Sequence, residues 1–354
     1  MDTFRIDSHK LVHHLDRLHD WSKGIDIYPV YMEISPAGSC NHRCIFCALD
    51  YLEYKPRFLE TGVLTKCIAD AAAKGLKSVM FAGEGEPLLH KDITRIVAFC
   101  SRKKVDTAIT TNGVLLTEKI APALLKHLSW LRVSFNGATA ASYARIHRTK
   151  PEDFTRVGAN LTRAIRIRDR ERYRCTIGAQ FLLIEENFNE VIRMASLAER
   201  IGLDYLIIKP YSQHPLSKNR LGGKLDYRAL LGIEKKLARF TKGRCEIVFR
   251  AHTMTKLHEK KPYGKCLGLP FWAYLNTDGD IYGCSCFLGD ERFRYGNIYR
   301  TSFESIWKGK RRMAFNTMMR TRWDIGRCRQ ACRMDEINRF LWELKNPPAH
   351  VNFI

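Results

Sequence analysis

Short β-rich runs alternate with longer runs of helical periodicity through the first 211 residues of the chain. The β-rich runs cover residues 27–34, 78–83, 106–113, 130–137, 175–184 and 204–211. Between them, apolar residues recur at spacings of three and four, which is the period of a helix with one buried face. Repeated βα units form parallel sheets, so we expect an α/β fold built as a partial (β/α)6 barrel.

This alternation stops after Pro215, where glycines and charged residues become frequent. The 354 residues also exceed one typical domain of about 150 residues. We therefore expect an N-terminal extension over 1–27, the barrel over 28–215, a linker with a connecting helix over 216–262, and a smaller α+β domain over 263–354. In parallel α/β folds, functional groups gather at the carboxyl ends of the strands.

Cysteine is frequent, with twelve in the chain. The N-terminal residues include acids and histidines, and no apolar run approaches the ~20 residues of a membrane-spanning helix. These features predict a cytoplasmic protein without a membrane span, in which thiols stay reduced. Metal or cluster ligation is then the better explanation for cysteines in close groups. Four cysteines in apolar patterns are instead predicted to be small buried hydrophobes, namely Cys67, Cys100, Cys175 and Cys245.

Three cysteines crowd the loop after the first predicted strand. Cys40, Cys44 and Cys47 form a C-x3-C-x2-C pattern. Soft thiolates select zinc, cuprous copper or iron–sulfur clusters, and a four-iron cluster takes one ligand for each iron. Three cysteines would leave one iron open, as in a reactive metal site. A structural zinc knuckle is the alternative, although it normally takes four ligands.

The loop and the strand ends that follow it resemble the radical S-adenosylmethionine (SAM) superfamily. Phe46 precedes the last cysteine of the loop, as an aromatic does in that family. The run from Glu84 to Pro87 is similar to its GGEP-type motif at the second strand. Two further runs are similar to its next two strand-end motifs, namely TTNG at 110–113 and SFNG at 134–137. The resemblance implies a TIM-like partial barrel over about residues 28–211.

The resemblance also implies the cofactors and the residues that bind them. A [4Fe-4S] cluster would bind Cys40, Cys44 and Cys47, and SAM would chelate its open iron. One electron from the cluster would then cleave SAM to methionine and a 5′-deoxyadenosyl radical that takes hydrogen from a C–H bond. The implied SAM-binding residues are Phe46, Gly85, Glu86 and Pro87, then Thr111, Asn112, Ser134 and Asn136 for the carboxylate and ribose, and Arg148. Relatives often carry an acid at the position of Asn136.

A second cysteine group lies in the C-terminal region. Its members Cys266, Cys284, Cys328 and Cys332 would make four ligands. The intervening sequence predicts a β-hairpin with a type I′ turn at Asp278-Gly279. The spacing resembles the SPASM extension of radical SAM enzymes, and more closely its shortened twitch form, which implies one auxiliary [4Fe-4S] cluster. Cys286 is left over as an alternative ligand or an ordinary thiol.

These patterns lead to three hypotheses about function. The first is a radical SAM oxidoreductase that takes hydrogen from a sugar, aminocyclitol or sugar nucleotide and oxidises or epimerises it, with a base among Lys209, Tyr211 and His214. A flavodoxin or ferredoxin would reduce it, and the net charge of +22 favours an anionic substrate. The second is a peptide- or protein-modifying radical SAM enzyme. The third is a basic, zinc-containing RNA-binding protein, although no RNA-binding module is visible and nucleic acid is not expected.

Overall fold

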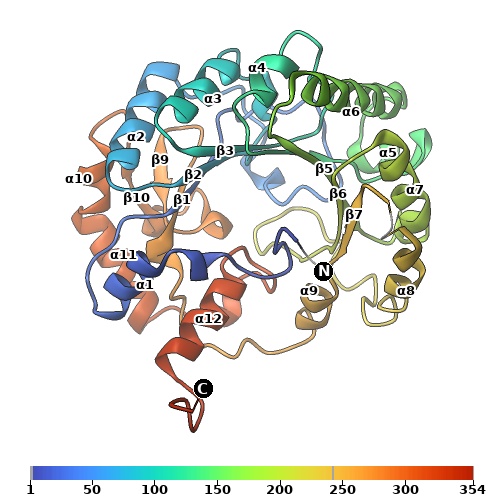
Figure 1. Ribbon diagram of the computed structural model, residues 1–354. Coiled ribbons are helices and arrows are strands. Elements are labelled where there is room, and N and C mark those ends of the chain that lie inside the picture. Colours follow the sequence, from blue (N-terminus) through green and yellow to red (C-terminus); the bar gives the residue numbers. More distant parts are fainter. Residues whose placement is uncertain (1–2, 241–242, 354) are drawn as a thin grey trace.

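The computed structural model describes residues 3–240 and 243–353 and contains one curved ten-stranded sheet in the order β10-β9-β8-β1-β2-β3-β4-β5-β6-β7 (Figure 1). Residues 1–2, 241–242 and 354, which fall in the expected extension, linker and C-terminal domain, lie outside the described residues. The strands are β1 (Tyr31–Ile34), β2 (Ser78–Phe81), β3 (Asp106–Thr111), β4 (Trp130–Ser134), β5 (Thr176–Leu183), β6 (Tyr205–Pro210), β7 (Glu246–Phe249), β8 (Trp272–Leu275), β9 (Asp280–Tyr282) and β10 (Arg294–Asn297).

Strands β1 to β6 are the predicted partial barrel, and each pairs in parallel with the next. Every predicted strand is present, although each is shorter than the β-rich run that predicted it. Two further parallel strands extend the barrel. β7, within the segment expected as a linker, pairs with β6, and β8 of the C-terminal region pairs with β1. The C-terminal region therefore shares its sheet with the barrel.

Helices cover the outer face of the sheet (Figure 1). In α3 the buried residues Ile93, Ile96, Val97 and Cys100 recur at helical spacing, so one face packs on the sheet. The four cysteines predicted to be buried are 0 to 3% exposed. The helices are α1 (Leu15–Ser22), α2 (Thr61–Ala73), α3 (Ile93–Arg102), α4 (Ala121–Leu125), α5 (Ala140–His147), α6 (Glu152–Glu171), α7 (Val191–Ile201), α8 (Ile233–Leu237), α9 (Ala251–Lys256), α10 (Phe303–Trp307), α11 (Lys310–Thr321) and α12 (Asp335–Lys345).

The N-terminal segment and α12 cover the side of the barrel between β7 and β8 (Figure 1). Leu11 and Ile27 of that segment pack with Phe271 and with Leu341 of α12. At the other end of α12, Asp335 accepts a hydrogen bond of 2.8 Å from Lys256 of α9. These contacts close the open side of the barrel with elements from both ends of the chain.

The predicted hairpin joins β8 and β9, but its turn differs from the prediction. Gly279 has a positive φ of +83°, whereas Asp278 is not among the residues with positive φ. A type I′ turn needs positive φ at both central residues. The Gly279 amide instead donates to the carbonyl of Asn276, which gives a type I turn followed by a left-handed glycine. The predicted type I′ turn is therefore wrong.

No helix among residues 3–240 and 243–353 is long and apolar enough to cross a membrane.

Candidate active site

The loop of Cys40, Cys44 and Cys47 follows β1 at the carboxyl end of the sheet. Backbone and side-chain bonds fix this loop to the next two strand ends. The Glu86 amide donates to the Ser39 carbonyl at 2.8 Å, and the Asn112 amide group donates to Asn41 at 2.6 Å. Burial raises the pKa of Cys40 to about 12, so its thiolate would form at neutral pH only with a bound metal to stabilise it.

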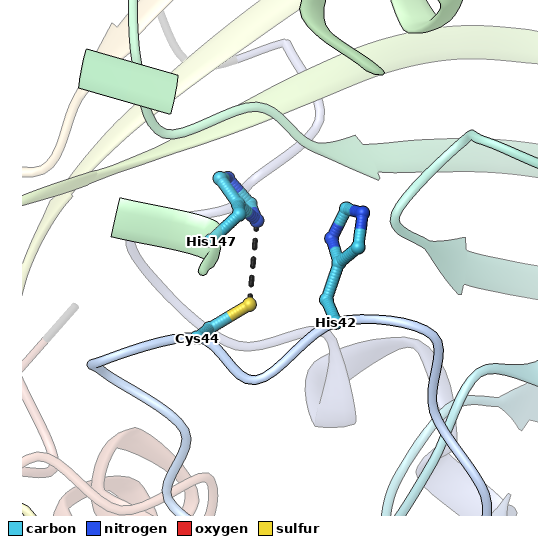
Figure 2. A group of neighbouring side chains, drawn as sticks. All are labelled: His42, Cys44 and His147. Carbon is cyan, nitrogen blue, oxygen red and sulfur yellow. Dashed lines mark hydrogen bonds between the residues drawn. The ribbon is translucent and has the colours of Figure 1, made fainter. Parts of the chain in front are cut away.

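A histidine contacts the middle thiol of this loop, as Figure 2 shows. His147 Nδ1 lies 3.3 Å from Cys44 Sγ, and its Nε2 accepts a hydrogen bond of 3.2 Å from the Asn136 amide. Burial and the neighbouring His42 hold the pKa of His147 well below its usual range, so the ring is neutral. Since Nε2 is the acceptor, the proton lies on Nδ1 and is donated to Cys44.

His42, Cys44 and His147 also lie close enough together to hold a single metal ion. The tautomer of His147 does not fit that role, because a metal ligand needs a free lone pair on Nδ1. The ring is instead held in place by stacking on Tyr143, with ring centroids 4.2 Å apart. His147 is therefore a hydrogen-bond donor to the Cys44 thiol rather than a metal ligand.

The segment at the end of β2 fits against the cysteine loop without room for side chains. A Cβ atom on Gly85 would lie 2.1 Å from the Ser39 carbonyl oxygen and 2.6 Å from that of Ala37. Glu86, which is 2% exposed, accepts hydrogen bonds from the Thr111 hydroxyl at 2.6 Å and from the Asn112 amide at 2.8 Å. Pro87 starts the short helical turn that follows. The predicted SAM motifs of β2 and β3 are thus joined directly.

The other predicted SAM-binding residues have different surroundings. Asn136 is fully buried, and its side-chain oxygen accepts the Leu182 amide at 2.6 Å. Ser134 ends β4 and is partly exposed. Arg148 is exposed and has a positive φ of +47° at the end of α5. The side chain of Asn136 thus joins β4 to β5, and both of its amide atoms contact other protein groups.

A second buried acid connects the barrel to the C-terminal hairpin. Glu84, 4% exposed, accepts hydrogen bonds from the Thr277 hydroxyl at 2.6 Å and from the Thr277 amide at 3.2 Å. The two residues are 193 positions apart in the sequence. The strand-end motif of β2 therefore positions the β8–β9 turn as well as the cysteine loop.

The C-terminal cysteines Cys266, Cys284, Cys328 and Cys332 lie near one another, and Cys286 lies beside them. Its amide donates to Cys284 Sγ at 3.4 Å, and its thiol interacts with those of Cys284, Cys328 and Cys332. Two other side chains donate to sulfur atoms of the group: Asn338 to Cys266 at 3.4 Å and the Trp323 indole to Cys328 at 3.3 Å. Hydrogen bonds of this kind orient ligands and tune a bound cluster.

Both cysteine groups reach one cavity of about 580 Å³. Phe46 and Cys47 of the first loop and Cys286 and Cys332 of the second group contribute to its lining. The volume lies within the range of about 300 to 1,000 Å³ that is typical of small-ligand sites.

The three predicted proton-transfer residues also line this cavity, namely Lys209, Tyr211 and His214. Burial, together with the charge of Arg132 and neighbouring arginines, holds the pKa of Lys209 well below its usual range. The Tyr211 hydroxyl donates to Gln213 at 3.4 Å, and burial raises its pKa. His214 lies beside Cys286, and its Nδ1 accepts the Leu216 amide at 3.2 Å.

Comparison with known proteins identifies two regions of the chain. The radical SAM superfamily matches residues 34–198, and the SPASM iron–sulfur cluster-binding domain matches residues 266–333. GTP 3′,8-cyclase of Stenotrophomonas maltophilia (strain R551-3) is 32% identical over 130 residues, which are 34% of this chain and 39% of the cyclase. The match thus spans about two fifths of that relative's length.

Two other relatives resemble the chain over most of its length. The tungsten-containing aldehyde ferredoxin oxidoreductase cofactor-modifying protein of Pyrococcus furiosus is 22% identical over 312 residues, 80% of this chain and 81% of that protein. The crystal structure of Streptococcus suis SuiB bound to SAM gives a TM-score of 0.69 at 17% identity and covers 92% of this chain and 76% of SuiB. SuiB has also been solved with its precursor peptide SuiA. At such identity the likeness to SuiB shows the fold.

The chain is a radical SAM enzyme. More particularly, it belongs to the radical SAM enzymes that carry a C-terminal SPASM iron–sulfur domain. It therefore binds SAM and a [4Fe-4S] cluster through its barrel and auxiliary iron–sulfur through its C-terminal region. The donor sets fit, because the three thiols after β1 and the five in the C-terminal region are soft ligands of iron–sulfur clusters. The zinc-containing RNA-binding hypothesis is set aside.

Several residues that build the site were not predicted from the sequence. His147 lies next to Arg148, which was predicted, but its partner Cys44 is 103 positions away. Glu84 lies in the predicted motif, but the motif does not predict its hydrogen bond to Thr277. Arg132, Arg329 and Arg333 line the cavity without any spacing pattern. Among these three arginines, only Arg132 had a signal in the sequence that could have predicted its place in the site. It lies two residues before Ser134 and therefore on the same face of β4.

Proposed function

We propose that this enzyme takes a hydrogen atom from a small polyhydroxylated molecule, such as a sugar, an aminocyclitol or a sugar nucleotide, and oxidises or epimerises it. The observation that carries the proposal is the single cavity lined by both cysteine groups. Its volume suits a small molecule beside a cofactor. Oxidation is favoured over rearrangement, since the auxiliary cysteines Cys286 and Cys332 line the same cavity as Cys47.

When bound, the cluster and SAM supply the radical that removes hydrogen. The residues of this chain orient the C–H bond of the substrate towards that radical. We propose Cys40, Cys44 and Cys47 as the ligands of the first cluster. The Cys47 carbonyl accepts hydrogen bonds from the Ser217 hydroxyl at 3.3 Å and from the Asn219 amide group at 3.2 Å, which hold the loop against the segment after β6. The auxiliary ligands are Cys266, Cys284, Cys328 and Cys332, with Cys286 beside them.

The SAM-binding residues remain those of the strand ends. We propose that Phe46 packs on SAM and that the Gly85 to Pro87 backbone with Glu86 binds its amino group, because Glu86 Oε2 accepts one hydrogen bond, from the Asn112 amide, and retains a lone pair. Thr111 and Asn112 hold this segment, and Ser134 and Arg148 are the candidates for the remaining polar contacts. The side chain of Asn136 is bound to Leu182 and supports β4 and β5 instead. One of Lys209, Tyr211 and His214 takes a proton from the substrate.

The reductant is proposed to be an acidic electron-transfer protein such as a flavodoxin or ferredoxin. The net charge of +22 favours association with an acidic partner. The exposed basic residues Lys308, Arg320, Arg322 and Arg327 lie in the C-terminal region, where they add to this field.

Modification of a peptide is the alternative function. SuiB, which shares the fold, has been solved with a precursor peptide, whereas the GTP 3′,8-cyclase is named for a nucleotide substrate. A cavity of about 580 Å³ has room for a sugar or nucleotide, while a peptide needs a path for the chain on both sides of the modified residue. The lining of this cavity by both ends of the chain favours the small molecule.

Deuterium transfer tests the proposal. The reconstituted enzyme, dithionite and SAM are incubated with perdeuterated sugars, aminocyclitols and sugar nucleotides, and 5′-deoxyadenosine is analysed by mass spectrometry. Deuterium in 5′-deoxyadenosine from one of these compounds is the expected result, with a product two electrons more oxidised. Label that comes from deuterated peptides and from no small polyol would contradict the proposal.

A further inference from the structure

Five cationic side chains surround one part of the cavity. They come from β4, β6, the end of β7 and the segment that carries the last two cysteines: Arg132, Lys209, Arg250, Arg329 and Arg333. Lys209 interacts electrostatically with all four arginines. Since these residues come from four separate elements, the fold itself brings the five charges together.

Protein groups neutralise only part of this charge. Arg333 forms an ion pair of 2.7 Å with Glu33 of β1, and Arg250 forms one of 3.0 Å with Asp7 of the N-terminal segment. Glu33 is the carboxylate of β1 within reach of Arg132 and Lys209 as well, but it is already bound to Arg333. Lys256, which also lines the cavity, is paired with Asp335 and Glu336.

Three of the cations have no carboxylate partner among residues 3–240 and 243–353. Arg132 donates only to the Thr110 hydroxyl at 3.3 Å, and its buried Nε has no hydrogen-bond partner there. Arg329 donates to the Ser212 carbonyl at 2.9 Å. Lys209 has neither a hydrogen bond nor an ion pair in this part of the chain. Unpaired charges removed from bulk water are costly unless a counter-ion completes the site.

We infer that Lys209, Arg132 and Arg329 bind a phosphate or diphosphate group of the substrate inside this cavity. The inference rests on the proposed function, and it narrows the substrate to a phosphorylated small molecule. Two or three positive charges without partners match the charge of a phosphate, whereas a single carboxylate leaves most of them uncompensated. Arginine forks suit the oxygens of a phosphate.

Arg329 lies between Cys328 and Cys332, so it belongs to the auxiliary cysteine segment, and Lys209 lies on β6, away from the SAM motifs at the ends of β2, β3 and β4. Arg132 lies on β4 two residues before Ser134, so competition with SAM decides whether the anion site is separate. Burial and the neighbouring arginines lower the pKa of Lys209, but a bound phosphate raises that pKa again, so Lys209 would bind the anion in its charged form. Tyr211 and His214 are then left as the candidates for proton transfer.

Binding of inorganic pyrophosphate tests the inference. Pyrophosphate is titrated by calorimetry into the reconstituted enzyme saturated with SAM, at constant ionic strength. Lys209→Met and Arg329→Met should each weaken binding about tenfold or more, because a hydrogen bond between charged groups contributes about 1.5 to 3 kcal/mol and 1.4 kcal/mol is tenfold. Lys209→Arg keeps the charge and should retain binding. The matched controls Lys236→Met and Arg200→Met change exposed cations and should alter binding less than twofold.

Four results would overturn the inference: no binding of pyrophosphate, equal losses in the exposed controls, equal binding of citrate, or exclusion of pyrophosphate by SAM. The last result would assign the cations to the SAM site. The outcome is separate from that of the proposed function. Pyrophosphate binding without deuterium transfer from any phosphorylated polyol would leave the anion site and contradict the function. Deuterium transfer from an unphosphorylated polyol without pyrophosphate binding would support the proposed function and contradict the anion site.

Discussion

Gly85 shows how one residue fixes two parts of the site. The backbone of the cysteine loop passes so close to Gly85 that any Cβ would meet carbonyl oxygens of Ser39 and Ala37. These are backbone atoms, so the contact is relieved only by moving the loop. The loop also receives the Glu86 amide, which follows directly.

Gly85→Ala is therefore expected to displace the first cysteine loop and to lower its cluster occupancy. The reconstituted variant should lose about four irons per chain and its production of 5′-deoxyadenosine, while the auxiliary cluster remains. Iron analysis with Mössbauer spectroscopy measures the loss of the first cluster and the retention of the auxiliary one, and a SAM cleavage assay measures 5′-deoxyadenosine. Gly158→Ala is the matched control, because nothing lies within 4 Å of its Cβ position in α6. Full iron content in Gly85→Ala would contradict this reading of the close contact.

His147 is the second residue whose role is testable by itself. Its Nδ1 proton points at Cys44 Sγ, and a hydrogen bond to a ligand sulfur stabilises the extra negative charge of a reduced cluster. His147→Phe removes the donor and keeps an aromatic ring on Tyr143. We expect the reduction potential of the first cluster to become more negative, measured by a redox titration followed by EPR.

His127→Phe provides the control for this potential, because His127 is a partly exposed histidine just after α4. An unchanged or more positive potential in His147→Phe would show that the Cys44 contact does not act on the cluster.

At the scale of elements, the sequence predicted what short-range periodicity encodes. The six barrel strands and the β8–β9 hairpin follow from local patterns. β7 was missed because its four residues, Glu246–Phe249, follow a long segment with loop composition. The turn at Gly279 was assigned the wrong type, since Asp278-Gly279 also fits a type I turn that ends in a left-handed glycine. Pairings between distant single residues, such as Glu84 with Thr277, leave no local pattern.

The pairing of α9 with α12 is the element contact most open to test. Lys256 and Asp335 are buried, with side chains 4% and 3% exposed, and Tyr263 donates a further hydrogen bond of 2.7 Å to Asp335. Removing Lys256 leaves the buried Asp335 carboxylate with Arg339 at 3.1 Å and Tyr263, so Lys256→Met should cost about 1.5 to 3 kcal/mol of unfolding free energy. Chemical denaturation under anaerobic conditions measures this. Adding Asp335→Asn to Lys256→Met should restore a large part of the lost unfolding free energy. The control Lys236→Met should change that free energy little.

The same pair predicts a pH dependence. Burial alone would raise the pKa of Asp335, but the hydrogen bonds from Lys256 and Tyr263 leave it below its usual value. A carboxyl with a depressed folded-state pKa stabilises the fold above its unfolded pKa of about 3.9, and this contribution is lost as the pH falls through the folded value.

In Lys256→Met the pKa of Asp335 should rise, so protonation relieves the buried charge. The loss of stability should be largest at neutral pH and shrink towards a pH of about 5. A loss that is constant over this range would mean that packing, rather than charge, accounts for the effect.

At the scale of the whole molecule, elements from both ends of the chain complete the barrel around one cavity. The N-terminal segment and α12 cover the side between β7 and β8, and both cysteine groups reach the cavity. The sequence predicted the two groups from their spacing. It did not predict that they share one cavity or that five cations surround part of it, because these facts depend on how distant elements pack.

Our central proposal is that the thiols of Cys40, Cys44 and Cys47 bind the cluster that cleaves SAM. The direct test is the variant with all three cysteines changed to alanine, with Cys245→Ala as a control for loss of a buried thiol. With dithionite and SAM, the triple variant should keep its auxiliary iron and form no 5′-deoxyadenosine, while the control forms it at the normal rate. Formation of 5′-deoxyadenosine by the triple variant would contradict the account.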